Sequence, residues 1–210
     1  MDPHKVISRH RKKYAVANTR GLAMLPEGQA GSRQIVLYDG DLMHSLLEND
    51  FWGAWEESPD VFRGFLDVQD PSQQCGNVYK VAEVLAKRGY GPLLYDIALT
   101  YARLDGMDGV IPDRRSVSPA ALNIWKYYAT QRRDVTRKPI EVSQACKEYP
   151  EEVLNYVYSI QRPVDLGSML RLHKQLAKKA LAANLYEDEY NTLILEEGWG
   201  HWQSWAEENL

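Results

Sequence analysis

A strand, a glycine-rich turn and an apolar helix follow one another in the middle of the chain, and this run constrains the fold most. Residues 77–86 (NVYKVAEVLA) predict a strand because they are rich in apolar and β-branched residues. The turn sequence KRGYGP follows at residues 87–92. Residues 93–104 predict a helix, because apolar residues recur at helical spacing: Leu94, Ile97, Ala98, Tyr101 and Ala102.

Other strand and helix signals lie on both sides of this run. Residues 33–38 (RQIVLY) and 62–68 (FRGFLDV) predict strands, and Asp39-Gly40 is a turn signal. Asp41 is expected to be the N-cap of a short helix that reaches Leu47.

Downstream, residues 110–112 predict a short strand. Ser118 and Pro119 fit the N-cap and first position of a helix that includes Tyr128. Asp165 is expected to cap a later amphipathic helix.

This order predicts an α/β (α+β) fold, in which a mixed central sheet is flanked by helices and followed by a helical C-terminal extension. We expect an N-terminal basic arm and loop at 1–32, the main domain at 33–150, and an extension at 151–210 that packs on the same domain and is mostly helical.

Composition excludes some classes of protein. The net charge of -4 argues against a general nucleic-acid binder. A local basic arm at residues 4–13 is expected to be a solvated terminus, or else to contact an acidic partner or nucleic acid. No apolar run approaches the roughly 20 residues of a membrane span, and the charged start does not have the apolar stretch expected of a signal peptide. Cys75 and Cys146 are expected to be reduced thiols without a metal, so we expect a cytoplasmic protein.

The glycine-rich turn has the chemistry of an anion site. Free N–H groups at a helix start favour a phosphate, and glycine lets the backbone approach it closely. Lys87 and Arg88 add positive charge beside these amides, and Pro92 suits a first helical turn. The alternative is a purely structural turn, since a lone Gly-x-Gly is a weak motif.

The strings GYGPLLYDIALTYA and PDRRSVSPAALNIWKYY carry a family resemblance, which is best over residues 77–130. With a strand before them and a strand between them, they resemble the GNAT (acetyl-CoA-dependent N-acetyltransferase) superfamily, and in particular the GNAT-like proteins of tailed bacteriophages. The resemblance implies a GNAT-like sheet and acetyl-CoA as cofactor. It also implies that backbone N–H groups at the splayed end of the fourth strand polarise the thioester. The cofactor-binding residues it implies are Val84, Leu85, Ala86, Lys87, Arg88, Gly89, Tyr90, Gly91, Pro92 and Ser118.

The chain departs from the family pattern at three positions. Ala86 stands where the family has Arg or Gln, Ser118 replaces an Asn, and Trp125 replaces a tyrosine that serves many members as an acid. Lys87 and Arg88 could supply the missing charge in a different register.

Three side chains are candidates for proton transfer. Strict alternation would place Glu83 on an apolar strand face with Tyr79, Val81 and Leu85, where burial raises a carboxylate's pKa and suits a general base. Asp113 is a second candidate base, and Tyr128 is the candidate general acid. The alternatives are an exposed or ion-paired Glu83, a loop-capping or ion-paired Asp113, and a packed core aromatic at Tyr128.

We therefore expect an acyl-CoA-dependent N-acyltransferase in which an amine attacks the thioester directly. The acceptor could be a protein lysine, a small amine or a modified base. The alternatives are a non-catalytic GNAT-like phage accessory protein that binds a host protein, and a nucleic-acid-associated factor that uses residues 4–13. His173 is expected to be a surface or half-buried histidine and not a ligand. The tryptophans at 199, 202 and 205 are expected to pack, and Trp52 and Trp55 to pack or line an acceptor groove.

Overall fold

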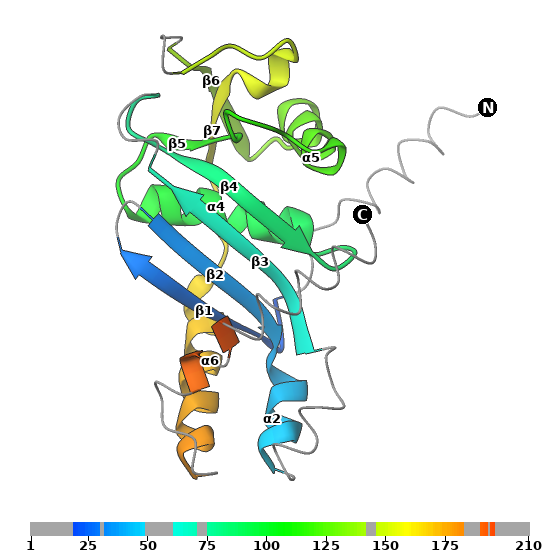
Figure 1. Cartoon of the computed structure of the whole chain (residues 1–210), viewed down its shortest axis with the longest axis vertical. Coiled ribbons are helices and arrows are strands. Elements are labelled where there is room, and N and C mark those ends of the chain that lie inside the picture. The colour runs from blue at the N-terminus through cyan, green and yellow to red at the C-terminus, as the bar shows by residue number, and fades with distance from the viewer. Residues whose placement is uncertain are drawn as a thin grey trace, which may run out of the picture.

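The computed structural model of the chain describes residues 19–29, 32–48, 61–70, 75–141, 146–182, 190–192 and 194–195. Within these residues the strands form one seven-stranded sheet in the order β1-β2-β3-β4-β5-β7-β6 (Figure 1). Neighbouring strands are antiparallel except β4 and β5, which are parallel. The strands are β1 (Leu22–Gln29), β2 (Ser32–Asp39), β3 (Phe62–Gln69), β4 (Val78–Ala86), β5 (Gly109–Ile111), β6 (Val135–Pro139) and β7 (Tyr156–Ile160).

Helices cover this sheet and form with it the two main hydrophobic cores of the described residues. The helix α4 (Gly91–Leu104) is buried along most of its length and contacts β3, β4, β5 and β7. The helix α6 (Leu166–Ala182) packs on β1 and on α2 (Gly40–Glu48). The helix α5 (Pro119–Thr130) contacts β6 and the short 3-10 helix η2 (Glu152–Leu154). A mixed sheet flanked by helices is therefore confirmed.

Several local predictions are confirmed by hydrogen bonds. Ser118 caps α5, since its Oγ accepts from the N–H of Ala121 at 3.2 Å. Asp165 caps α6, since its Oδ1 accepts from the N–H of Ser168 at 3.2 Å. The predicted cap at Asp41 is wrong, because α2 begins at Gly40, two residues earlier than a cap at Asp41 implies. Asp39 is the cap, and its Oδ1 accepts from the N–H groups of residues 41 and 42 at 3.1 and 3.0 Å.

The strands β6 and β7 were not predicted, and β1 lies in residues 1–33, for which the sequence predicts a strand or arm followed by a loop. The strand β1 includes Gly28 and Pro26, which read as loop residues in the sequence. The strands β6 and β7 pair with each other, and β7 also pairs with β5 at Val110↔Tyr158. Residues 156–160 are therefore part of the central sheet, although they lie beyond the expected boundary at 150.

A β-bulge in β4 changes which face of the sheet carries Glu83. Val81 pairs with Val68 and Glu83 pairs with Asp67, so Ala82 is an extra residue in the ladder. Tyr79 and Val81 lie in the core beneath α4, whereas Leu85 packs against the core on the opposite side. The expectation that Glu83 shares a face with Tyr79 and Val81 is wrong, because the extra residue reverses the alternation.

The two cysteines form a disulfide, Cys75–Cys146. The expectation of reduced thiols is wrong, because the fold brings the turn before β4 against the segment between β6 and β7. The spacing of 71 residues gives no hint of this pairing. The cytoplasmic expectation loses this support and stays a prediction. The basic arm, Trp52, Trp55 and the tryptophans at 199, 202 and 205 lie outside the described residues.

Candidate functional site

The candidate site begins at an edge of β4 that lacks a strand partner. Parallel pairing with β5 joins only Val78–Lys80 to Gly109–Ile111. Beyond Lys80, no described strand pairs with β4 on that side. Figure 1 shows the end of β4 running away from β5 toward the start of α4. The second half of β4 thus keeps a free backbone edge within the described part of the chain.

The register on the other side of β4 shows which backbone groups lie on this edge. Lys87 N–H donates to the carbonyl of Arg63 at 3.1 Å. Hydrogen-bonded residues alternate in an antiparallel pair, so Leu85 and Glu83 also direct their N–H groups to β3. The N–H groups of Val84 and Ala86 therefore point to the free edge. Within the described residues they have no acceptor.

The turn after β4 continues this row of donors. Gly89 has φ +96, a left-handed conformation that suits glycine. Tyr90 is the N-cap of α4 and makes no side-chain cap hydrogen bond. No described residue accepts from the N–H groups of Gly89 or Gly91. The start of α4 therefore offers uncapped amides and the positive end of the helix dipole.

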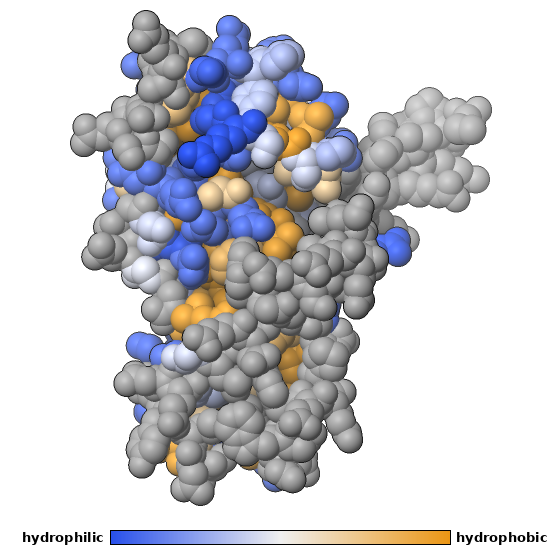
Figure 2. Space-filling model, in the orientation of Figure 1, coloured by the Kyte–Doolittle hydropathy of each residue, from blue (hydrophilic) through white to orange (hydrophobic). Residues whose placement is uncertain are grey.

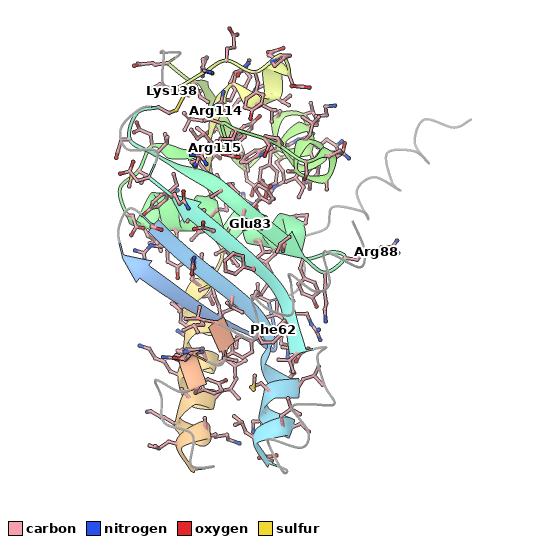
Figure 3. All side chains as sticks on the ribbon, viewed as in Figure 1. Phe62, Glu83, Arg88, Arg114, Arg115 and Lys138 are labelled. Atoms are coloured by element: carbon pink, nitrogen blue, oxygen red, sulfur yellow. A yellow bond between two sulfur atoms is a disulfide. The ribbon has the colours of Figure 1, made fainter. Side chains whose placement is uncertain are left out.

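Side chains around the turn leave part of it open. An added Cβ at Gly89 would meet no atom within 4 Å, whereas one at Gly91 would meet Ile124 Cδ1 at 3.3 Å and Ala86 Cβ at 4.0 Å. Arg88 is exposed and projects outward beyond the end of β4 (Figure 3). The loop thus has free space beside Gly89, an apolar contact from Ile124 of α5 near Gly91, and the exposed positive charge of Arg88.

Apolar surface also gathers beside this edge. Figure 2 shows hydrophobic side chains over α5 and near the end of β4, with hydrophilic ones over β6 and β7. The partly buried apolar residues packed on the core include Val84 and Ala86 of β4 and Ala121, Leu122 and Ile124 of α5. A ligand at the edge would meet backbone donors on one side and apolar side chains on the other.

Glu83 stands beside these donors and faces Asp67 across the sheet. The two residues are direct partners in the β3–β4 register. Glu83 is exposed, as in the alternative to a buried base, and partial desolvation, followed by the negative charge of Asp67, raises the pKa of its carboxyl. Burial likewise raises the pKa of Asp67, against a hydrogen bond from Gln69 Nε2 at 2.7 Å. Asp67 Oδ1 is buried and has no hydrogen-bond partner in the described structure. The bulge thus places two carboxylates side by side.

Asp113 lies toward the paired end of β4. Its carboxylate accepts from Ser116 N–H at 3.1 Å and lies 3.7 Å from Lys80 Nζ. Its neighbour Arg114 is held by the carbonyls of Leu154 and Lys147 and points away from Arg88 (Figure 3). The structure therefore gives Asp113 the loop-capping and ion-paired environment that was the alternative to a base.

Tyr128 is buried and belongs to a network beneath the start of α4. Its hydroxyl lies 2.9 Å from the Pro92 carbonyl oxygen and 2.6 Å from Asp96 Oδ1, and its single proton can be donated to either. Arg132 pairs with Asp96 at 2.9 Å and with Asp134 at 2.8 Å. Burial, followed by the charge of Asp96, raises the pKa of Tyr128 well above its usual value. This placement supports a positioning role more than a proton-donor role.

Trp125, which the resemblance aligns with a tyrosine of many GNAT enzymes, is also part of the core. It is 1% exposed and packs edge-on against Tyr95, with ring centroids 5.0 Å apart. The Oγ of Ser118 is engaged in the α5 cap described above. Neither residue projects into the free edge of β4.

Two important acids were missed by sequence reasoning. Asp67 reads as a routine polar position in the 62–68 strand, and only the bulge reveals that it opposes Glu83. Asp96 could have been noticed, because an acid within an otherwise apolar helix calls for a buried partner, which Arg132 supplies.

Comparisons with family models, curated proteins and solved structures found no match for this chain. Among the described residues, no helix is long and apolar enough to cross a membrane. The same residues contain no group of three or more His, Cys, Asp or Glu that could hold a metal ion.

Proposed function

We propose that the chain is an acyl-CoA-dependent N-acyltransferase with a GNAT-like fold, and that it transfers an acetyl group to an amine. The observation that carries this proposal is the free edge of β4 at Val84 and Ala86, which continues directly into the uncapped start of α4. One continuous row of N–H groups suits a ligand that has a carbonyl at one end and a diphosphate at the other.

The order of elements supports the family part of the proposal. The chain runs from β4 through the Gly-Tyr-Gly turn to α4, then to the parallel strand β5 and to α5. This is the succession that the resemblance implies for residues 77–130. The short pairing of β4 with β5 also suits a fourth strand with a splayed end.

The residues present fit acetyl-CoA by the chemistry of their donors. Amides at Gly89 and Gly91 and the charge of Arg88 would hold the diphosphate. The N–H groups of Val84 and Ala86 would hold the thioester carbonyl. When bound, acetyl-CoA supplies an activated acyl group for attack by the amine. In this proposal the exposed carboxylate of Glu83, next to Val84 and with a raised pKa, would accept the amine's proton.

A non-catalytic GNAT-like protein is the second candidate. It is favoured by Trp125, which fills the position of the family's tyrosine acid and is fully packed. Ala86 likewise lacks the charge that the family places before the turn. A chain of this kind could keep the fold and act by binding a host protein instead.

Thermal unfolding with 1 mM acetyl-CoA tests the proposal. A ligand present at about 100 times its Kd stabilises the folded state by about 2.7 kcal/mol, so the melting temperature should rise clearly. Arg88→Glu should weaken binding by about tenfold, because it places a negative charge beside the diphosphate. Lys138→Glu is the matched control, since Lys138 is also exposed but lies on β6 (Figure 3).

The outcomes separate the two candidates. A rise in the wild type that Arg88→Glu reduces and Lys138→Glu retains supports the acyltransferase. No rise in the wild type contradicts it and favours the interaction protein.

A further inference from the structure

The disulfide joins two parts of the sheet that share only a short strand ladder, although α4 packs across both. Cys75 precedes β4, the last strand of the antiparallel set β1–β4. Cys146 lies between β6 and β7, which belong to the other set, β5, β7 and β6. The ladder between the two sets is the short parallel pairing of Val78–Lys80 with Gly109–Ile111. The disulfide therefore adds a covalent link beside this short ladder.

The link is embedded in a small core of its own. Both cysteines are buried, and they pack with Val78, Ile111, Ile140 and Val157 in a cluster separate from the two larger cores. These four residues come from β4, from β5, from the residue after β6, and from β7. The cluster thus lies where the two parts of the sheet meet, and the disulfide within it links the two parts covalently.

The free edge of β4 lies at the opposite end from this link. From Lys80, β4 continues to Ala86, which is about 20 Å at a rise of about 3.3 Å per residue. A rotation of about 5° at the paired end would displace the far end by about 2 Å over such a length. That displacement is several times the roughly 0.5 Å range of hydrogen-bond distances, so the donors at Val84 and Ala86 are sensitive to it.

We propose that Cys75–Cys146 is a redox-controlled lock that fixes the angle between the two parts of the sheet and thereby the ligand-binding geometry of the β4 edge. The effect on ligand binding rests on the proposed function, whereas the lock itself does not. A dithiol opens the lock by thiol–disulfide exchange: the S–S bond breaks, both cysteines become thiols, and the dithiol is oxidised to a disulfide. Gly76 and Asn77, which follow Cys75, are exposed, so local opening of this turn gives the reductant access.

Hydrogen exchange of the full chain, with and without dithiothreitol, tests the lock without any ligand. Reduction should speed exchange of residues 78–80, 109–111 and 156–160 several-fold and leave α2 and α6 unchanged. The double variant Cys75→Ser/Cys146→Ser should exchange like the reduced protein in both conditions. Unchanged exchange, or an equal increase throughout the chain, overturns the proposal. Finding two alkylatable thiols in the denatured, unreduced protein also overturns it.

Acetyl-CoA titration of the oxidised and reduced forms then tests the coupling. We expect the two affinities to differ by at least fivefold. Equal affinities overturn the coupling to the β4 edge. If exchange responds to reduction but neither form binds acetyl-CoA, the lock stands and the proposed function fails.

Discussion

At the scale of single residues, Glu83 and Asp67 define the chemistry that the β4 edge can support. A base must be deprotonated to accept a proton, and its raised pKa moves that state to higher pH. Asp67→Asn removes the neighbouring negative charge and should lower the pKa of Glu83. The pH at which acetyl transfer to a primary amine reaches half its maximum should therefore fall in this variant.

Glu83→Gln completes this prediction, because an amide cannot accept the proton. We expect the rate of CoA release from acetyl-CoA and amine to fall about 100-fold while acetyl-CoA still raises the melting temperature. A Glu83→Gln variant with the wild-type rate and pH profile would show that Glu83 is not the base.

Tyr128 was expected to act as a general acid in the site, but its hydroxyl is buried beneath the start of α4. Tyr128→Phe leaves Asp96 and the Pro92 carbonyl without the hydroxyl and should destabilise the protein by about 1–2 kcal/mol, measured by urea unfolding. The rate of acetyl transfer should change little. A loss of rate by two orders of magnitude with unchanged stability would instead restore Tyr128 as the general acid.

At the scale of secondary-structure elements, features set by local sequence can be predicted from the sequence, whereas features set by long-range strand pairing cannot. The strand, turn and helix at 77–104 were predictable because periodicity and glycine act over a few residues. The strand β6 was not, because only Val135 in it is buried and its pairing with β7 arises from distant sequence. The bulge at Ala82 and the disulfide also depend on non-adjacent segments. The loop at residues 87–92 could therefore be predicted from the sequence, whereas the face of the sheet that carries Glu83 could not.

Glycine at position 109 makes the close pairing of β5 with β7 possible. It has φ +154, and an added Cβ would lie 2.2 Å from the Tyr158 carbonyl oxygen. Gly109→Ala should therefore cost more than about 2 kcal/mol in unfolding free energy, since backbone must move. Gly106→Ala is the control: φ is +73 but no atom lies within 4 Å, so only about 1 kcal/mol of conformational strain is expected. Equal costs for the two variants would contradict this account.

At the scale of the whole molecule, His173 connects three parts of the chain. The expectation of a surface or half-buried histidine is wrong, because this residue of α6 is 6% exposed. Its Nδ1 lies 2.8 Å from the Tyr38 hydroxyl of β2, and its ring stacks on Tyr190. Burial, followed by the charge of Lys174, lowers the pKa of His173 to about 4. The neutral imidazole is thus a condition for packing Tyr190 and α6 against Tyr38 of the sheet.

This condition makes the stability of the protein depend on pH in a defined direction. Between pH 6.5 and about 4 the unfolded chain binds a proton at this histidine and the folded chain does not. The contribution is therefore fully present above pH 6.5 and decreases as the pH falls toward 4, by up to about 3 kcal/mol. Urea unfolding at pH 7, 6 and 5 should show this decrease in the wild type and a flatter dependence in His173→Gln. Because His44 is exposed and present in both proteins, the difference between them isolates His173, and parallel pH profiles would show that protonation of His173 is not what couples this packing to pH.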